Sequence, residues 1–388
     1  MVESSRWPWL DKPGRVPGFQ GGASIGASCP APPGAQAAFN SSDRGLRVEE
    51  ITTADGLSRL RTDWNEVEGA GEPINPFLSW DWQWTWWEAY GEGRELHCMV
   101  VADDDQVVGI VPLQCSAGGP RKFELGGGAD LSDHLGFLFR PGRAPEVVTI
   151  ALEHLLRGDQ DKGSLLFDLH YLVDSSPALD AFGQAAGRLG LRRDLTQEEV
   201  SPQVVLGQDF DSYLATRLNK KDRHELRRKM RRLDLERPAW SQVTQKDLGL
   251  KPALDAFFVL LRASGAHKVD FLTPDVEQFI RRACARLEER GWLRLQFIQS
   301  GDQLIAATMG FTVSGSWNLY NSGYQPDAGF LSPGLICVAE GIRSALEEHC
   351  HTADFLRGSE AYKYHLGAVD KPLWRLQLSP AETPRVSP

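Results

Sequence analysis

The sequence is poor in cysteine and has no long apolar run. Its six cysteines are scattered and form no Cys-x-x-Cys pair, so the sequence indicates neither a zinc knuckle nor a disulfide framework. No stretch approaches the roughly 18 consecutive apolar residues that a membrane-spanning helix needs. We therefore expect a cytoplasmic protein with no membrane span and no bound metal.

An excess of positive charge is also lacking. The net charge is −10 and the isoelectric point is about 5.5, which argues against binding DNA through the overall field of the protein. Apolar residues make up 41% and charged residues 24% of the 388-residue chain, as in an ordinary globular protein. At roughly 100 to 200 residues per domain, this length is sufficient for two domains with separate cores.

The first 45 residues differ from the rest of the chain. They hold six prolines and seven glycines with little periodic apolar content, which predicts a flexible leader over residues 1–45. The residues after Arg6 and Lys12 are interrupted by Gly and Pro and lack the apolar centre of a secretion signal. We expect the folded part to begin near Leu46.

After this leader, short apolar runs alternate with amphipathic segments, which is typical of mixed α/β structure. Strands are expected at 46–52, 96–102, 107–113, 293–299 and 304–311, and helices at 57–67, 80–90, 145–156 and 335–348. A shift of 197 residues aligns the hairpin around Gln106 with the hairpin around Gln303. Each hairpin is followed by a strand, a helix and another strand, so we infer two copies of one α/β unit, at 46–206 and 236–388.

Between the two copies lies the densest charge of the chain. From Arg217 to Arg232, nine residues are basic and two are acidic. The connecting helix expected over 207–235 places basic residues, among them Arg223 and Arg227, on one side and leucines on the other. This charge is either an ordinary solvated helix face or a binding site for phosphate or another polyanion.

Two segments of the second copy are candidates for chemistry. Ser332 followed by Pro333 predicts a helix start, and the first turn of such a helix is either simply capped or an anion site. Further on, Glu360 and Lys363 lie three residues apart. They form either a surface salt bridge or, if the sheet opens on a cleft there, a site in which Lys363 stabilises an oxyanion.

Two segments of the first copy have alternative interpretations as well. A short helix contains five of the chain's twelve tryptophans, with Trp80, Trp84 and Trp87 on one face and Trp82 and Trp86 on another. One face is expected to be core, and the other to line a substrate groove or to contact the sister domain. The glycine run at 126–128 does not match a dinucleotide motif. The neighbouring Asp133 and His134 are either an acid/base pair or part of a loop that satisfies its own backbone.

The order of five segments resembles a known family. These segments are FLSWDWQWTWWEAYG, LGGGADLSDHLGFL, LNKKDRHELRRKMRRL, LYNSGYQPDAGFLSPG and DFLRGSEAYKYHLG. Together they resemble the CelD/BcsL-type (BioF2-like) acetyltransferases of the GNAT superfamily and, more distantly, the FemABX peptidyltransferases. The resemblance covers about residues 46–378. It implies two tandem GNAT folds, each a mixed, mostly antiparallel sheet flanked by helices.

The resemblance also implies a reaction and a site. An acyl group, normally acetyl, would pass from acyl-CoA to an amine acceptor that is a small molecule or is linked to a glycan, in cell-envelope or exopolysaccharide synthesis. Lys363 would assist the oxyanion, Tyr320 or Tyr324 would protonate the thiolate, and Asp133 or Glu360 would deprotonate the amine. The full expected site comprises catalytic Lys363, Glu360, Tyr320 and Asp133, cofactor-binding Gly329, Ser332, Gly334 and Leu335, and substrate-binding Trp80, Trp84, Arg223, Arg227, Tyr324 and Tyr362.

Two other functions stay open at this point. The basic segment 217–232 favours a FemABX-like aminoacyl transfer from charged tRNA, which would be sensitive to salt. The loop 327–334 departs from the usual Q/R-x-x-G-x-G/A pattern of GNAT phosphate loops. That departure favours a non-catalytic GNAT-fold scaffold of a polysaccharide synthase.

Overall fold

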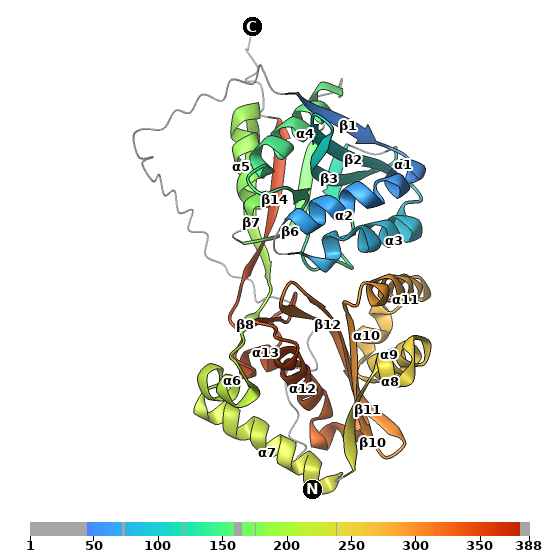
Figure 1. Cartoon of the computed structure of the whole chain (residues 1–388), viewed down its shortest axis with the longest axis vertical. Helices are drawn as coiled ribbons and strands as arrows, with labels where there is room; N and C mark the ends of the chain where they lie inside the picture. The colour runs from blue at the N-terminus through green and yellow to red at the C-terminus, as the bar shows by residue number, and fades with distance from the viewer. Residues whose placement is uncertain are drawn as a thin grey trace.

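The computed structural model describes residues 45–71, 74–118, 121–158, 165–174, 176–237 and 239–380. The leader expected over residues 1–45 lies, but for its last residue, outside the described residues. Two α/β units are stacked along the long axis of the molecule (Figure 1). Across the described ranges, no helix is long and apolar enough to cross a membrane.

The first unit is built on an eight-stranded sheet with the order β1-β2-β3-β4-β6-β14-β7, and β5 pairs with β3. Its strands are β1 (Leu46–Ile51), β2 (Arg94–Asp103), β3 (Gln106–Ser116), β4 (Lys122–Leu125), β5 (Leu138–Phe139), β6 (Leu166–Val173), β7 (Leu191–Val200) and β14 (Pro372–Pro380). Its helices are α1 (Ala54–Arg59), α2 (Arg61–Ala70), η1 (Pro76–Leu78), α3 (Trp80–Tyr90), α4 (Ala144–Gly158) and α5 (Pro177–Leu189). The helix expected over 57–67 is thus two helices, α1 and α2, which meet at Leu60.

Both faces of this sheet are covered. Alternate residues of a strand point to opposite faces, and in β2 one set, including Leu96 and Cys98, packs with helices α1 to α3. The other set, including Met99 and Val101, packs with α4 and α5. The middle of strand β2, Cys98 to Ala102, is therefore apolar on both sides, which is why its sequence is a continuous apolar run there.

The second unit is built on a six-stranded sheet with the order β8-β13-β12-β11-β10-β9. Its strands are β8 (Gln203–Val205), β9 (Trp240–Thr244), β10 (Leu293–Ser300), β11 (Gln303–Val313), β12 (Ser316–Tyr324) and β13 (Thr352–Asp354). Its helices are α6 (Phe210–Arg217), α7 (Lys220–Glu236), α8 (Gln245–Leu248), α9 (Leu250–Ala263), α10 (Ala266–Phe271), α11 (Pro274–Glu289), η2 (Pro326–Leu331), α12 (Pro333–Glu347) and α13 (Ala361–His365). The expected fold class is confirmed, with two mixed, mostly antiparallel sheets flanked by helices.

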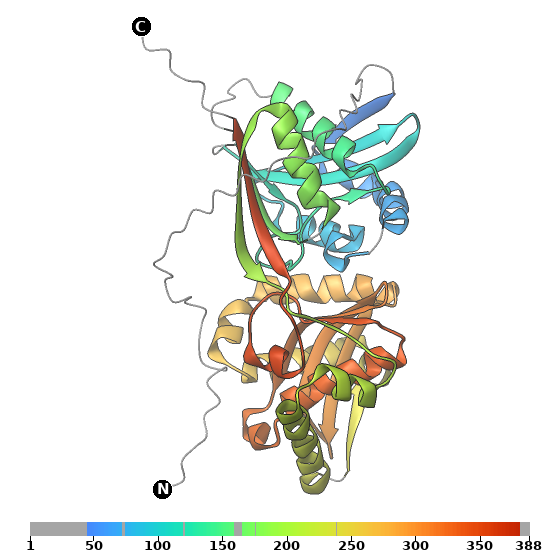
Figure 2. The same ribbon diagram turned by 90° about the vertical axis from the view of Figure 1, so that its left-hand side faces the viewer.

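The two units exchange strands at the points where the chain passes between them. β8 follows the first unit in sequence but pairs with β13 of the second sheet. β14 follows the second unit but lies between β6 and β7 of the first sheet (Figures 1 and 2). Buried Leu373, Leu376 and Leu378 anchor β14 in the first unit. The expected ranges 46–206 and 236–388 therefore each include a strand that pairs in the other sheet.

The basic segment is also divided differently. The single helix expected over 207–235 is in fact two, α6 and α7, separated at Leu218 and Asn219. The side chain of Asn219 caps α7 by accepting a hydrogen bond from the backbone N–H of Asp222 at 2.9 Å. This cap stabilises the start of a second helix. The sequence prediction missed this start because the basic residues continue across it.

Candidate active site

A cavity of about 190 Å³ opens where the second sheet splits. Strands β12 and β13 are parallel neighbours over only three residue pairs, the last being Asn318 with Asp354. Beyond that pair, β12 continues to Tyr324. The segment that follows β13 turns away at Leu356, whose φ is +54°. The two diverging segments form opposite walls of the cavity.

One wall ends at the start of α12. Ser332 precedes the helix in a left-handed conformation with φ +57°, and its side chain makes no capping bond to its own helix. The first-turn amides of a helix have no intrahelical partner, and together with the helix dipole they favour an anion. Gly334 keeps this turn narrow, because a Cβ there would lie 3.2 Å from Cδ1 of Tyr324.

A buried lysine of α7 points at the same place. The ammonium of Lys229 donates to Oγ of Ser332 at 3.1 Å, and only 5% of the residue is exposed. Burial lowers the pKa of Lys229, although the charge of Glu225 opposes this effect. A second cation, Arg232, donates to the backbone oxygen of Phe330 at 3.1 Å. The start of α12 therefore combines free backbone amides with the ammonium of Lys229, and an anion bound there would interact with both.

Lys363 lies in the opposite wall with its ammonium fully engaged. Its Nζ donates to the backbone oxygens of Leu356, Arg357 and Gly358 at 3.1, 2.9 and 2.9 Å. The carboxylate of Glu360 lies 2.8 Å from the same nitrogen. An ammonium has three protons, so an acyl oxygen would have to displace one of these acceptors. The geometry favours a positioning role, in which Lys363 holds the turn that forms the wall.

Replacing Lys363 by methionine tests this positioning role. We expect the free energy of unfolding to fall by about 1–3 kcal/mol, because buried carbonyl groups lose their donor. Hydrogen exchange should also accelerate at the amides of residues 356–360. If Lys363 served only an oxyanion, the stability and the exchange rates of the variant would match those of the wild type.

A family model decides which kind of domain surrounds this cavity. Residues 220–364 match the model described as an acetyltransferase (GNAT) domain. The chain carries a GNAT-type acetyltransferase domain. This GNAT domain includes α7, β12, α12 and Lys363, so both walls of the cavity belong to it. No curated protein matches the chain at a significant level.

Solved structures share the fold of most of the chain. FemX is 12% identical, with a TM-score of 0.57 over 85% of this chain and 96% of that chain. A conserved protein of unknown function from Bacteroides thetaiotaomicron is 12% identical, with a TM-score of 0.54 over 86% and 99%. The C-terminal domain of a protein assigned as a lysylphosphatidylglycerol synthetase, from Agrobacterium fabrum, is 9% identical, with a TM-score of 0.53 over 84% and 92%. At these identities, the likeness concerns the fold.

Most of the residues expected from the sequence line the cavity of the GNAT domain. Those present in its lining are Lys363, Glu360, Tyr320, Gly329, Ser332, Gly334, Leu335, Tyr324 and Tyr362. The charge and hydrogen bonds of Lys363 outweigh the effect of burial on Glu360 and lower its pKa. Glu360 is therefore a carboxylate at neutral pH and a weak base for an amine.

Tyr320 is engaged at the boundary of the two units. Its hydroxyl donates to the backbone oxygen of Leu131 in the first unit at 3.0 Å, and burial raises its pKa well above the ordinary value. It is also the extra residue of a β-bulge, because Met309 pairs with Asn321 and Gly310 with Leu319. This position favours a structural role over proton donation to a thiolate.

Asp133 lies behind the cavity wall and does not line the cavity. Its carboxylate is 3.1 Å from Nε of Arg357, which itself lines the cavity. Burial raises the pKa of Asp133, although Arg357 opposes the effect. The pair links the first unit to the GNAT domain, so Asp133 is better placed to orient Arg357 than to contact an amine.

The four other expected substrate contacts lie elsewhere. Trp80 and Trp84 stack on each other at 5.6 Å in the core beside α1 and α2. Arg223 donates to the backbone oxygen of Ala215 at 3.0 Å, and Arg227 pairs with Asp211 at 3.2 Å. These arginines brace α6 against α7, and none of the four residues lines the cavity. The other face of α3 contacts the second unit, where Trp82 meets Phe279 at 5.1 Å.

Two residues that the sequence did not single out complete the site. Both His267 and Lys268 of α10 line the cavity, and Nζ of Lys268 donates to Oδ1 of Asn321 at 2.6 Å. Partial burial and the charge of Lys268 lower the pKa of His267. Its imidazole is therefore neutral at pH 7 and able to accept a proton. A histidine next to a lysine in a short helix matches no sequence motif, so the sequence did not indicate that His267 lines the cavity.

Proposed function

We propose that the protein is an N-acyltransferase that transfers an acyl group, such as acetyl, from acyl-CoA to a primary amine. The proposal rests on the anion cradle, formed at the start of α12 by Ser332, Gly334 and Lys229, in which Lys229 donates a hydrogen bond to Ser332. This cradle lies inside the domain that matches a GNAT family model. The pyrophosphate of the donor suits this cradle because it is a compact anion. The acyl end would then point into the cavity.

The cavity supplies groups for the transfer itself. We propose that the neutral imidazole of His267 accepts the proton that the amine loses as its nitrogen bonds to the thioester carbon. The carbon–sulfur bond then breaks, and the thiolate leaves in the cavity, at the other end of the pantetheine arm from the pyrophosphate. Tyr324, which lines the cavity, is the proposed proton donor to that thiolate. The Glu360 carboxylate attracts the acceptor as an ammonium ion, which releases one proton to solvent before its nitrogen attacks the thioester.

Replacing Lys229 by methionine tests the donor site. We expect the affinity for acetyl-CoA to fall about tenfold to a hundredfold, because a hydrogen bond to a charged group contributes about 1.5–3 kcal/mol. The melting temperature of the protein without donor is measured alongside, because the substitution also removes the hydrogen bond to Ser332 and the ion pair with Glu225. Calorimetric titration gives the affinity, and thermal denaturation gives the stability.

Lys221→Met is the matched control, because Lys221 is an exposed lysine of the same helix. It removes the same charge and should leave the affinity for acetyl-CoA within about twofold. Equal losses in both variants would mean that the helix acts only through its overall field. Absence of binding by the wild type to acetyl-CoA and to longer acyl-CoAs would overturn the proposal.

The exposed face of α7 supports a second candidate, aminoacyl transfer from charged tRNA. Lys220, Lys221 and Arg231 are exposed on the same helix that carries Lys229. Phosphate contacts of a nucleic acid would make binding strongly dependent on salt. Saturable binding of aminoacyl-tRNA that weakens steeply between low and moderate salt, together with no binding of acyl-CoA, would favour this reaction.

A further inference from the structure

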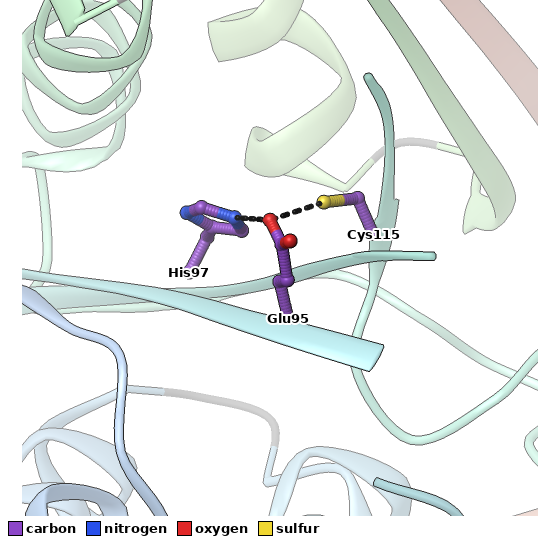
Figure 3. A group of neighbouring side chains, drawn as sticks. All are labelled: Glu95, His97 and Cys115. Carbon is purple, nitrogen blue, oxygen red and sulfur yellow. Dashed lines mark hydrogen bonds and ion pairs between the residues drawn. The ribbon is translucent and has the colours of Figure 1, made fainter. Parts of the chain in front are cut away.

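Three side chains that commonly bind transition metals meet in the first unit, outside the GNAT domain. Glu95 and His97 lie two residues apart on one face of β2. Cys115 of β3 is the direct antiparallel partner of Glu95. Their ligand atoms all lie within 4.8 Å of one another, and no other such group of three occurs among the described residues. Figure 3 shows the Glu95 carboxylate between the imidazole and the thiol.

The imidazole of His97 is oriented as a metal ligand would be. Its Nδ1 lies 2.6 Å from a carboxylate oxygen of Glu50 on β1. The other carboxylate oxygen of Glu50 lies 3.0 Å from Nε2 of His154, so Glu50 is held between two imidazoles. A carboxylate at Nδ1 holds that proton and leaves the lone pair on Nε2, as in carboxylate–histidine–zinc triads.

The other ring nitrogen has no hydrogen-bond partner among the residues that the structure describes. His97 is only 6% exposed, and its Nε2 is a buried polar atom with no hydrogen-bond partner. An unsatisfied buried acceptor is costly. This nitrogen faces Oε2 of Glu95 at 3.7 Å, so a cation between the two would satisfy both.

We propose that Glu95, His97 and Cys115 bind a divalent transition metal, with zinc as the best match. Oε2 of Glu95 is 3.7 Å from Nε2 of His97 and 3.7 Å from Sγ of Cys115. Ordinary zinc bonds at a tetrahedral angle would separate these pairs by about 3.4 and about 3.6 Å. The third pair, Nε2 of His97 and Sγ of Cys115, lies within 4.8 Å, so shifts of about 1 Å or less would bring three ligands onto one ion. The fourth position would hold water.

The surrounding charge is consistent with a cation. The carboxylates of Glu50 and Glu95 both lie against His97, and their negative charge attracts a metal ion. An ion that binds there displaces the thiol proton of Cys115. Arg94 also lies nearby, but its cation is directed to Gln114 at 2.9 Å and to Glu124.

The direct test is cobalt binding by the full chain after removal of metal with a chelator. We expect one Co²⁺ per chain with a thiolate-to-cobalt charge-transfer band in the near ultraviolet, and competition by Zn²⁺. Cys115→Ser should abolish the band. Glu95→Gln, which changes a partly exposed side chain and should not perturb folding, should weaken Co²⁺ binding at least tenfold.

Two controls separate metal binding from folding. Cys350→Ser removes another buried thiol, in the second unit, and should keep both the band and the stoichiometry. Zn²⁺ should raise the melting temperature of the wild type and of Cys350→Ser but not that of Cys115→Ser. A wild type with no charge-transfer band, or a band that persists in Cys115→Ser, would overturn the proposal whatever the stability of the variants.

Discussion

His267→Ala is expected to lower kcat for acyl transfer by about 10²- to 10⁴-fold, the usual contribution of a general base. The acetyl-CoA dissociation constant should stay close to the wild-type value, because the donor cradle lies at the start of α12 and does not include His267. The rate is measured as release of free thiol from acetyl-CoA in the presence of a panel of primary amines. His224→Ala serves as the control, since His224 is exposed on α7 and does not line the cavity.

The pH profile distinguishes a base from a residue that only shapes the cavity. Partial burial and Lys268 lower the pKa of His267 below its ordinary value, and only the neutral imidazole accepts a proton. The wild-type rate should therefore stay high as the pH falls to the ordinary histidine pKa and should decrease only below it. In His267→Ala this acid limb should disappear. A variant that keeps the wild-type limb, whatever its rate, would assign the base to another group.

Arg357→Met is expected to lower the free energy of unfolding by about 3–5 kcal/mol, the usual result of leaving one member of a buried ion pair alone. Arg357 belongs to the GNAT domain, but all three of its partners lie in the first unit. Its guanidinium pairs with Asp133 at 3.1 Å, donates to the backbone oxygen of Ala129 at 2.8 Å and lies 4.2 Å above the ring of Tyr171. The substitution leaves the carboxylate of Asp133 buried without its strongest counter-charge.

The sign of the pH dependence follows from the direction of the pKa shift. Burial raises the pKa of Asp133 in the folded state, and loss of Arg357 removes an effect that lowers it. When the pKa of a carboxyl group is higher in the folded state than in the unfolded state, the unfolded state loses its proton first as the pH rises. The free energy of unfolding therefore falls with rising pH. The deficit of Arg357→Met should therefore be large at pH 7 and shrink as the pH falls toward 4. Chemical denaturation at several pH values measures it.

A second substitution provides the matched control for this pair. Adding Asp133→Asn to Arg357→Met removes the buried charge itself, so most of the lost stability should return and the pH dependence should flatten. If the double variant were as unstable as Arg357→Met, the loss would come from packing on Tyr171 and from the Ala129 contact, and not from the ion pair.

Local patterns in the sequence predicted much of the architecture. The second strand of each expected hairpin begins at Gln106 and at Gln303 in the structure, as the shift of 197 residues indicated. Ser332 and Pro333 stand at the start of α12, as the helix-start signal predicted. These features depend on residues a few positions apart, whose backbone preferences and apolar periodicity act within one element. The GNAT resemblance then supplied the reaction class.

The tertiary structure alone decided which distant residues meet. Lys229 rather than Arg223 or Arg227 reaches the start of α12, because α7 is a separate helix with its own rotation after Asn219. The placement of β14 depends on which sheet has a gap between two strands, here β6 and β7, in which its leucines become buried, and no periodicity encodes that choice. Glu95, His97 and Cys115 likewise meet only through the register of β2 on β3. By itself the sequence predicted most of the elements and, through the resemblance, the kind of domain, whereas packing of surfaces far apart in the chain determined the site.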